Sequence, residues 1–186
     1  VFEFRYRIMM NTVLESDRRF GVVMWDQAQG KPASVGCCAE IIQFQRLPDD
    51  RMKIRTLGQQ RFRVLEYVRE KPYRVGLVEW IEDNPPEQNL KPLAEDVSQL
   101  LQDVVRLSAK LTGEPIELPD SMPQLPLELS YWIASNLYGV AEEQQALLEI
   151  QDTAARLERE AEILTSTRNH LAARTVLKDT LDDTLQ

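Results

Sequence analysis

The chain has 186 residues, 43% hydrophobic and 28% charged, which is typical of a globular protein of one or two small domains. Its net charge of −8 is uneven: residues 1–83 carry 14 Lys/Arg and 12 Asp/Glu, and residues 84–186 carry 8 and 18. Because an acidic half repels phosphate backbones, nucleic acid is not expected as a partner of the whole chain. No run of 18 apolar residues occurs, so no membrane span is expected.

The N-terminus and the cysteines predict a cytoplasmic protein. Residues 1–7 are charged from the start and contain no apolar signal core. The missing initiator Met indicates a trimmed or incomplete chain. Cys37 and Cys38 are adjacent, and neighbouring strand residues point to opposite faces, so the two cannot easily form a disulfide. Free thiols fit a reducing compartment.

The first half predicts one helix followed by antiparallel strands. The helix is expected over 3–16, where apolar side chains recur at helical spacing: Tyr6, Met9, Met10 and Val13. Five strands are expected over 20–25, 35–47, 51–57, 60–67 and 73–81, with a polar loop over 27–34. The strand at 20–25 reads as buried, and the one at 35–47 is expected to bend at Gly36 or at the cysteines.

Turn residues separate these strands. Asp49 and Asp50 tolerate a tight bend, Gly58 can take a positive φ, and Pro72 fixes φ. Gly58 is therefore expected to form the turn of a hairpin between 51–57 and 60–67. Five strands whose edges must be protected favour a small antiparallel pseudo-barrel over an open sheet.

A proline-rich linker is expected over 84–92, because Pro85, Pro86 and Pro92 stop a strand. It divides the chain into a β-rich pseudo-barrel subdomain over 1–83 and a helical subdomain over 93–186. The fold class expected is therefore α+β.

Two helices are expected directly after the linker. A one-sided apolar stripe predicts the first, over 93–111: Leu93, Val97, Leu100, Val104, Leu107 and Leu111. Gly113 and Pro115 end it. Pro126 suits the first turn of the second helix, which Gly139 is expected to break. Its inward side chains are expected to be Leu129, Trp132, Ile133 and Leu137.

A long last helix is expected over 142–181. Four side chains seven residues apart form a coiled-coil-like association seam: Ile150, Leu157, Leu164 and Leu171. At 1.5 Å per residue such a helix spans ~55–60 Å, more than a small domain can bury. Its far end is therefore expected to project, or to pair with a helix of a second copy or of another protein.

Catalytic and metal-binding patterns are missing from the sequence. There is no G-x-x-x-x-G-K-[ST] phosphate loop, and the seven glycines are scattered singly. His170 lies on the long charged helix rather than in a cleft, so it is not expected to be catalytic. The cysteines lack the C-x-x-C spacing of a metal site, so Cys37 and Cys38 are interpreted as small buried hydrophobic residues. The paired carboxylates at 49–50 and 182–183 belong to a turn and to the terminus. No enzyme activity, metal or cofactor is expected.

Two groups of side chains are candidates for binding. Arg61 and Arg63, near Arg55, project from one strand face and could contact an anion or an acidic peptide; pairing with Glu66, Glu79 or the acidic helices is the favoured alternative. Trp25, Tyr73 and Trp80 lie at strand ends. Exposed at a barrel rim they would bind unfolded apolar segments, although core packing is the commoner fate of such residues.

The order of short motifs resembles a known family. The motifs are F-E-F-R-Y-R (2–7), R-R-F-G-V-V (18–23), V-G-C-C-A-E-I (35–41), L-P-D (47–49), L-G-Q-Q-R-F-R-V (57–64), Y-R-V-G-L-V-E (73–79), W-I-A-S-N-L (132–137), E-Q-Q-A-L-L-E-I (143–150) and L-E-R-E (157–160). Together they resemble the N-terminal substrate-binding domain of Lon proteases, in its stand-alone bacterial form. The resemblance covers nearly the whole chain.

The resemblance implies a PUA-like pseudo-barrel, a helical bundle with a long last helix, and recognition of protein substrates. Family members usually begin with an apolar strand and a Pro-Gly loop, which are absent before Phe2. The full proteases continue into an ATPase module and a Ser-Lys peptidase domain; no segment here resembles these, and Lys53 and Lys110 read as surface charges.

The leading hypothesis is a non-enzymatic module that binds unfolded or extended polypeptide through exposed apolar surface or a free strand edge. One alternative is an adaptor or fragment of an ATP-dependent serine protease system. Another is an RNA-binding PUA-like domain, for which Arg55, Arg61, Arg63 and Tyr73 are the candidate residues.

Overall fold

The computed structural model describes residues 1–137 and 141–184, the last six of them by backbone alone. The chain divides into two compact units, Val1–Glu82 and Asp83–Gln186. The first is a sheet unit and the second a helical unit, and each is described by itself below.

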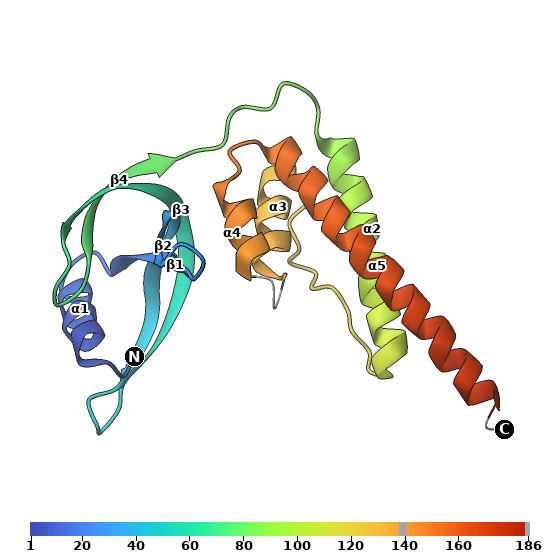
Figure 1. Ribbon diagram of the computed structural model, residues 1–186, viewed down its shortest axis with the longest axis horizontal. Coiled ribbons are helices and arrows are strands. Elements are labelled where there is room, and N and C mark those ends of the chain that lie inside the picture. The colour runs from blue at the N-terminus through green and yellow to red at the C-terminus, as the bar shows by residue number, and fades with distance from the viewer. Residues whose placement is uncertain (138–140, 185–186) are drawn as a thin grey trace. The chain divides into compact units, whose positions relative to one another are not determined.

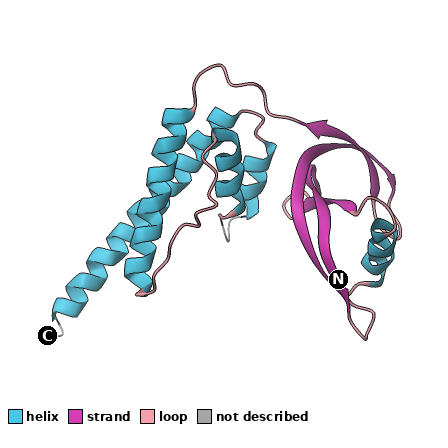
Figure 2. Ribbon diagram, turned by 180° about the vertical axis from the view of Figure 1, so that it is seen from behind, coloured by secondary structure: helices cyan, strands magenta, loops and turns pink. Residues whose placement is uncertain are grey.

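The sheet unit consists of one helix and a four-stranded antiparallel meander in the order β1-β2-β3-β4 (Figure 1). Its elements are α1 (Phe4–Leu14), β1 (Arg19–Asp26), β2 (Lys31–Arg46), β3 (Met52–Arg69) and β4 (Val75–Ile81). The long strands β2 and β3 curve strongly along their length (Figure 2). Such curvature turns a short meander into a pseudo-barrel, as expected for the fold.

Helix α1 supplies the core of the sheet unit. Its Met10 and Val13 are buried against Ile41 of β2 and Met52 of β3. The helix predicted over 3–16 is therefore confirmed, with its apolar side facing the sheet. Strand β1 differs from the prediction of a buried strand, because its Val22 is 50% exposed.

The hairpin expected at Gly58 is wrong. Strand β3 runs through this position, and Gly58 pairs with Ala39 of β2. Between this pair and the next, Cys37 with Arg61, β3 contains one residue more than β2. The L-G-Q-Q sequence therefore forms a β-bulge rather than a turn, and the sheet has four strands instead of five.

Two other details concern β2. The register shift between Cys37 and Ala39 places the extra residue in β3, so the bend expected in β2 at Gly36 or at the cysteines stays a prediction. The polar loop expected over 27–34 is too long, because only 27–30 form a turn and β2 begins at Lys31. The reason is that Lys31 and Pro32 pair with Asp26 and Trp25 of β1, which brings most of the expected loop into the sheet.

Two glycines of this sheet test the corrected strand assignment. A Cβ on Gly36 would lie 2.4 Å from the Val22 carbonyl oxygen, whereas one on Gly58 would meet only the Cys37 sulfur, at 3.6 Å. We expect Gly36→Ala to destabilise the sheet unit by about 1–3 kcal/mol through overpacking. Gly58→Ala should be neutral, or stabilising by up to about 1 kcal/mol through the less flexible unfolded chain. Urea unfolding, followed by near-ultraviolet circular dichroism, measures both changes in the free energy of unfolding. Equal losses of stability in the two variants would support the turn that the sequence predicted at Gly58.

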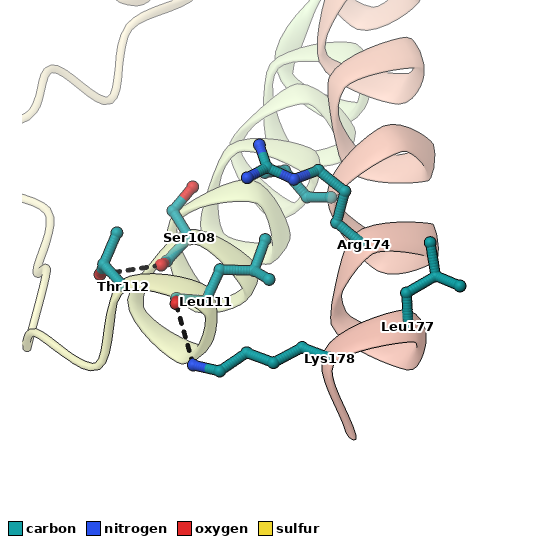
Figure 3. Close-up of a pocket in the computed structure, with 7 residues that line it drawn as sticks. Ser108, Leu111, Thr112, Arg174, Leu177 and Lys178 are labelled. Atoms are coloured by element: carbon teal, nitrogen blue, oxygen red, sulfur yellow. Dashed lines mark hydrogen bonds between the residues drawn. The ribbon is translucent and has the colours of Figure 1, made fainter. Parts of the chain in front are cut away.

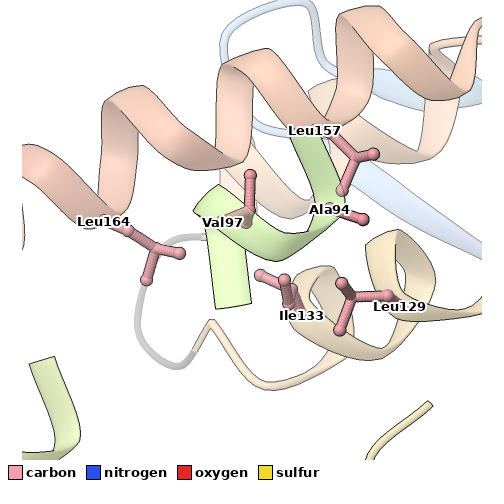
Figure 4. Close-up of a cluster of buried hydrophobic side chains, with 6 residues drawn as sticks. All are labelled: Ala94, Val97, Leu129, Ile133, Leu157 and Leu164. Atoms are coloured by element: carbon pink, nitrogen blue, oxygen red, sulfur yellow. The ribbon is translucent and has the colours of Figure 1, made fainter. Parts of the chain in front are cut away.

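The helical unit contains α2 (Lys91–Thr112), α3 (Pro126–Ser135), α4 (Ala141–Glu149) and α5 (Thr153–Thr184). Helices α2 and α5 lie side by side (Figures 1 and 2). Two side chains from each of three helices form the core (Figure 4): Ala94 and Val97, Leu129 and Ile133, Leu157 and Leu164. Trp132 packs against this core, as predicted.

The predicted end of α2 and the predicted start of α3 are confirmed, whereas α3 ends before Leu137, which was expected on it. Helix α2 ends at Gly113, whose φ of 75° is left-handed and favours glycine, and Pro126 is the first residue of α3. Helix α3 ends at Ser135, and the break expected at Gly139 lies outside the described residues.

The single long helix expected over 142–181 is wrong. It is interrupted after Glu149 and resumes at Thr153. The Asp152 carboxylate accepts the backbone N–H groups of Ala154 and Ala155, at 2.8 and 3.1 Å. Asp152 is therefore an N-cap, which starts α5 as a separate helix within a run of good helix formers.

Candidate functional site

A buried polar network surrounds the start of α5. Arg156 is fully buried, and its guanidinium donates to both carboxylate oxygens of Asp83 and, at 2.9 Å, to the Ser130 hydroxyl. Its Nη1 also donates to the Ile150 carbonyl at 2.9 Å, and the guanidinium lies 4.0 Å above the Tyr131 ring. Through these hydrogen bonds Arg156 joins the α4–α5 connection to α3.

Asp83 is the anion of this network. Burial would raise the pKa of its carboxyl group, but hydrogen bonds from Arg156 and Thr153, the Arg156 charge and a hydrogen bond from Tyr131 hold it below its usual value. An ionised carboxylate bound by a guanidinium and two hydroxyls is a structural ion pair rather than a proton donor or acceptor.

Glu160, one turn after Arg156, is a buried carboxyl group that lacks such hydrogen-bond partners. It is fully buried, and neither carboxylate oxygen has a hydrogen-bond partner. Burial raises the pKa of Glu160 to about 8, although the nearby Arg156 charge lowers it. The group is therefore protonated at neutral pH. Among the described residues, no cluster of three or more His, Cys, Asp or Glu side chains could hold a metal ion.

The cysteines are not activated. Burial raises the pKa of both Cys37 and Cys38, the former despite a hydrogen bond with the Gln59 backbone and the charge of Arg61. Both thiols are free, and a raised pKa makes a thiolate nucleophile unfavourable.

The predicted aromatic residues lie at the surface of the sheet unit. Trp25 is 48% exposed and Trp80 is 53% exposed. Trp80 also packs edge-on against Phe62, with ring centroids 6.3 Å apart. Both tryptophans therefore keep about half of their surface for contact with a ligand.

Arg74 lies between one predicted aromatic residue, Trp25, and Tyr67, which was not predicted. Its guanidinium lies 5.5 Å from the ring centroids of both Trp25 and Tyr67, and Arg69 lies over the ring of the neighbouring Tyr73. Trp25 of β1 and Tyr73 thus lie at one end of the curved sheet, and Trp80 lies near the other end of β4. Of the predicted aromatic residues, Trp25 therefore lies beside Arg74, and Tyr73 lies beside Arg69.

The two predicted arginines differ in access. Arg61 is only 4% exposed, whereas Arg63 is exposed. In the sheet register Arg63 lies directly opposite Glu79, which is one of the pairings that the sequence indicated. Of the two, only Arg63 is exposed.

The sequence did not indicate the aliphatic patch on the β3–β4 hairpin, which consists of Leu65, Val68 and Leu77. Their side chains are 57%, 62% and 56% exposed. The pairing shifts between Val64 and Glu66 and again beyond Tyr67, so Leu65 and Val68 are extra residues in β3. Bulges re-aim side chains, which explains why these apolar residues point to solvent. The signal in the sequence is the run V-L-E-Y-V-R, which breaks strict alternation twice.

The association seam lies mostly inside the unit. Leu157 and Leu164 are buried against α2 and α3, and Ile150 lies in the connection before α5. Of the four predicted residues, only Leu171 lies on the distal part of α5, where it is half-buried. The seven-residue spacing of Leu157 and Leu164 therefore reflects packing within the chain, which corrects their assignment to a contact with a partner.

A curved antiparallel sheet with an exposed aliphatic and aromatic surface, joined to a helical unit, defines a binding domain. The model of the ATP-dependent protease La (Lon) substrate-binding domain matches residues 1–166, and the chain belongs to this family. The family resemblance and the α+β fold class expected from the sequence are both confirmed.

The relatives agree with this assignment. The chain is 29% identical to Lon protease 2 of Myxococcus xanthus over 171 residues, which cover 88% of this chain and 21% of that protein. It is 34% identical to the Lon protease of Geobacter metallireducens over 129 residues, or 68% and 16% of the two proteins. The chain thus spans about a fifth of the length of these curated relatives.

Two solved structures share the fold. The Lon N-terminal domain protein from Xanthomonas campestris has a TM-score of 0.60 at 25% identity, with 86% of this chain and 83% of that chain covered. The N-terminal domain of the Mycobacterium avium complex Lon protease has a TM-score of 0.65 at 16% identity, with coverage of 90% and 87%, and shows likeness of fold alone. Within the described part of the chain, no helix is long and apolar enough to cross a membrane.

Proposed function

We propose that the chain is a non-enzymatic module that binds unfolded or extended polypeptide and presents it to a Lon-type ATP-dependent protease. Family membership supports the role in substrate binding, and the two free cysteines favour the cytoplasm. Whether the protease lies on the same polypeptide or on a separate one, the module supplies recognition and the protease supplies ATP hydrolysis and cleavage.

The observation that carries this proposal is the aliphatic patch on the β3–β4 hairpin. Leu65, Val68 and Leu77 expose more than half of their surface on one short hairpin. β4 is the last strand in the sheet order, and its Trp80 is also half exposed. Clustered exposed apolar side chains mark interaction sites, and folded proteins rarely offer matching apolar segments to such a site. Unfolded chains do, which explains the selectivity proposed here.

We expect the double variant Leu65→Ser/Leu77→Ser to bind unfolded polypeptide at least about tenfold more weakly. Burial of one leucine contributes about 1.5–3 kcal/mol, and about 1.4 kcal/mol corresponds to a factor of ten. The probe is fluorescently labelled, reduced and carboxymethylated α-lactalbumin, with native α-lactalbumin as the folded comparison, and anisotropy gives the affinity.

The matched control is Leu125→Ser, which removes a leucine that is 65% exposed before α3 in the helical unit. It should bind the probe as the unaltered chain does. Equal affinity of the double variant and the unaltered chain would contradict the patch, and equal affinity for native and unfolded α-lactalbumin would contradict the proposed function.

RNA binding has less support. Of the residues considered for it, Arg61 is buried, and Arg69 lies over the ring of Tyr73, on which a base would have to stack.

A further inference from the structure

Helix α3 covers one side of the paired helices α2 and α5 along their first halves. Its Leu129 packs there with Leu157 and Leu164 of α5 (Figure 4). Its Ser130 hydroxyl accepts a hydrogen bond from Arg156 of α5 at 2.9 Å. Arg156 therefore marks the side of α5 that faces α3.

The same side of α5 continues beyond this cover. Arg174 and Lys178 follow Arg156 and Glu160 by 18 residues, which is about five turns at 3.6 residues per turn, so the two pairs lie on one side of the helix. Arg156 and Glu160 are fully buried, whereas Arg174 and Lys178 are exposed. The side that α3 covers in the first half of α5 is therefore open in the second half.

A groove of about 480 Å³ lies on this open side, between the distal ends of α2 and α5 (Figure 3). Its aliphatic lining comes from Leu111 of α2 and from Leu171 and Leu177 of α5. The Lys178 ammonium donates to the Leu111 carbonyl at 3.2 Å, which ties the end of α2 to α5. Leu177 is 64% exposed, so the aliphatic lining is accessible from solvent.

The charges at this end of the helical unit are cationic, although the unit as a whole is acidic. Residues 84–186 carry 8 Lys/Arg and 18 Asp/Glu, yet the segments 104–113 and 163–178 hold five of these cations and no acidic residue. Arg174 and Lys178 are the charged side chains of the groove in the described part of the chain. Among the described residues, Arg174 has no hydrogen-bond or ion-pair partner. The groove is therefore complementary to an anionic group.

The covered half of α5 shows what satisfies such a surface. Five turns before Arg174, the guanidinium of Arg156 donates to both carboxylate oxygens of Asp83, and α3 supplies the apolar contact. Hydrogen bonds between a guanidinium and a carboxylate are among the strongest in proteins. By analogy, the open half would be satisfied by a helix with an aliphatic stripe and acidic side chains beside it.

We propose that the groove between the distal ends of α2 and α5 binds an acidic amphipathic helix of another protein. The aliphatic side chains of that helix pack on Leu111, Leu171 and Leu177. Its carboxylates pair with Arg174 and with Lys178, whose ammonium has three donors and gives one of them to Leu111. This is helix-in-groove recognition, in which apolar side chains three and four residues apart anchor the helix. The groove shares no residue with the aliphatic patch, so it is independent of the proposed function.

Nucleic acid and membrane surfaces fit this groove less well. In the described part of the chain its lining contains no Trp, Tyr or Phe, the side chains on which bases stack and which anchor a protein at a membrane surface. An acidic helix is the partner that satisfies both the aliphatic side chains and the two cations.

Fluorescence anisotropy with the full chain tests the groove. The probe is a labelled helical peptide of about 18 residues, with leucines along one face and glutamates beside them, five turns in length. The comparison is the same peptide with lysine in place of each glutamate. The glutamate peptide should bind, and the lysine peptide should bind at least about tenfold more weakly, because like charges then meet at Arg174 and Lys178.

Reversal of the groove charges should reverse this preference. With Arg174→Glu/Lys178→Glu, the lysine peptide should become the tighter ligand. Lys31→Glu/Lys91→Glu makes the same change of net charge elsewhere and should leave the preference for the glutamate peptide unchanged. A groove variant that still prefers the glutamate peptide overturns the proposal.

The aliphatic contact is tested by Leu177→Ser, which should weaken binding of the glutamate peptide about tenfold. Val176→Ser is the matched control, because Val176 is 65% exposed on the same turn and is not part of the groove lining. Leu177→Ser leaves the tie between Lys178 and Leu111 in place, and circular dichroism confirms that each variant keeps its helices. Leu65→Ser/Leu77→Ser, which alters the aliphatic patch, should bind the peptide as the unaltered chain does.

Three results contradict a helix of another protein in this groove. They are equal affinity of the unaltered chain for the two peptides, equal affinity of Leu177→Ser and Val176→Ser for the glutamate peptide, and loss of binding in the patch variant. Sedimentation of the chain alone adds a fourth. A mass that doubles from 21.5 kDa in the unaltered chain but not in Leu177→Ser would show that a second copy occupies the groove instead.

Discussion

Replacement of Glu160 by Leu is expected to stabilise the helical unit at neutral pH by up to about 3 kcal/mol. The Glu160 carboxyl is fully buried without a hydrogen-bond partner, and burial raises its pKa from 4.5 to about 8. In the unfolded chain the same group is solvated and has its ordinary pKa. Leu has a similar size and no polar atoms, so the replacement removes the cost of keeping this carboxyl protonated.

The expected gain depends on pH with a definite sign. Below pH 4.5 both states hold the proton, and Glu160 adds no pH dependence. Between pH 4.5 and about 8 the unfolded chain has lost the proton while the folded chain keeps it, so stability falls by about 1.4 kcal/mol per pH unit. Above about pH 8 both states are ionised and the loss is complete. The difference between Glu160→Leu and the unaltered chain should therefore widen from pH 4.5 to 8 and then stay constant.

Urea unfolding followed at 222 nm measures this difference, since most of the helix belongs to residues 83–186. Glu158→Leu is the matched control, because Glu158 is exposed on the same helix. It should show no change of slope with pH. A Glu160→Leu variant whose stability ran parallel to that of the unaltered chain from pH 4.5 to 8 would show that Glu160 is ionised in the folded state.

Replacement of Arg156 by Met is expected to destabilise the helical unit by about 3–5 kcal/mol, the usual cost of removing one partner of a buried ion pair. Asp83 would keep its hydrogen bonds from Thr153 and Tyr131 and lose the cation that holds its pKa low. The Ser130 hydroxyl and the Ile150 carbonyl would each lose a buried donor. The same replacement removes the charge that lowers the pKa of Glu160, so this pKa should rise further.

The double variant Asp83→Asn/Arg156→Met tests the cause. It removes both charges, so it should recover part of the stability lost in Arg156→Met, as measured by the same urea unfolding. In the unaltered chain the lowered pKa of Asp83 contributes stability at pH values above its ordinary 3.8, and this contribution is lost as the pH falls through the lower folded value. Equal stabilities of the single and double variants would show that lost packing, not the unpaired charge, is responsible.

The sequence predicted most helices and strands because the signals for them lie in neighbouring residues. The stripe from Leu93 to Leu111 has helical period, Gly113 takes the left-handed conformation that ends α2, and Pro126 occupies the first turn of α3. Trp25 and Trp80 are half exposed, although core packing was the commoner fate expected for such residues. The order of the motifs was sufficient for the family.

The errors arose where neighbouring strands or helices decide the outcome. Gly58 has the composition of a turn, but pairing with Ala39 keeps β3 continuous. Leu65 and Val68 look like core residues of a strand, and the bulges turn them outward. The period of Leu157 and Leu164 does not say whether the matching helix belongs to the same chain, and here α2 supplies it.

The sequence by itself determined the α+β class, the extent of most helices and strands, and the membership of the Lon substrate-binding family, because hydrophobic period, caps and motif order are properties of neighbouring residues. Only the tertiary structure decided that Arg156 and Glu160 are buried, that Arg61 is covered while Arg63 is open, and that the aliphatic patch and the distal groove exist. Burial and register depend on segments far apart in the chain, and no local pattern encodes which of them will meet.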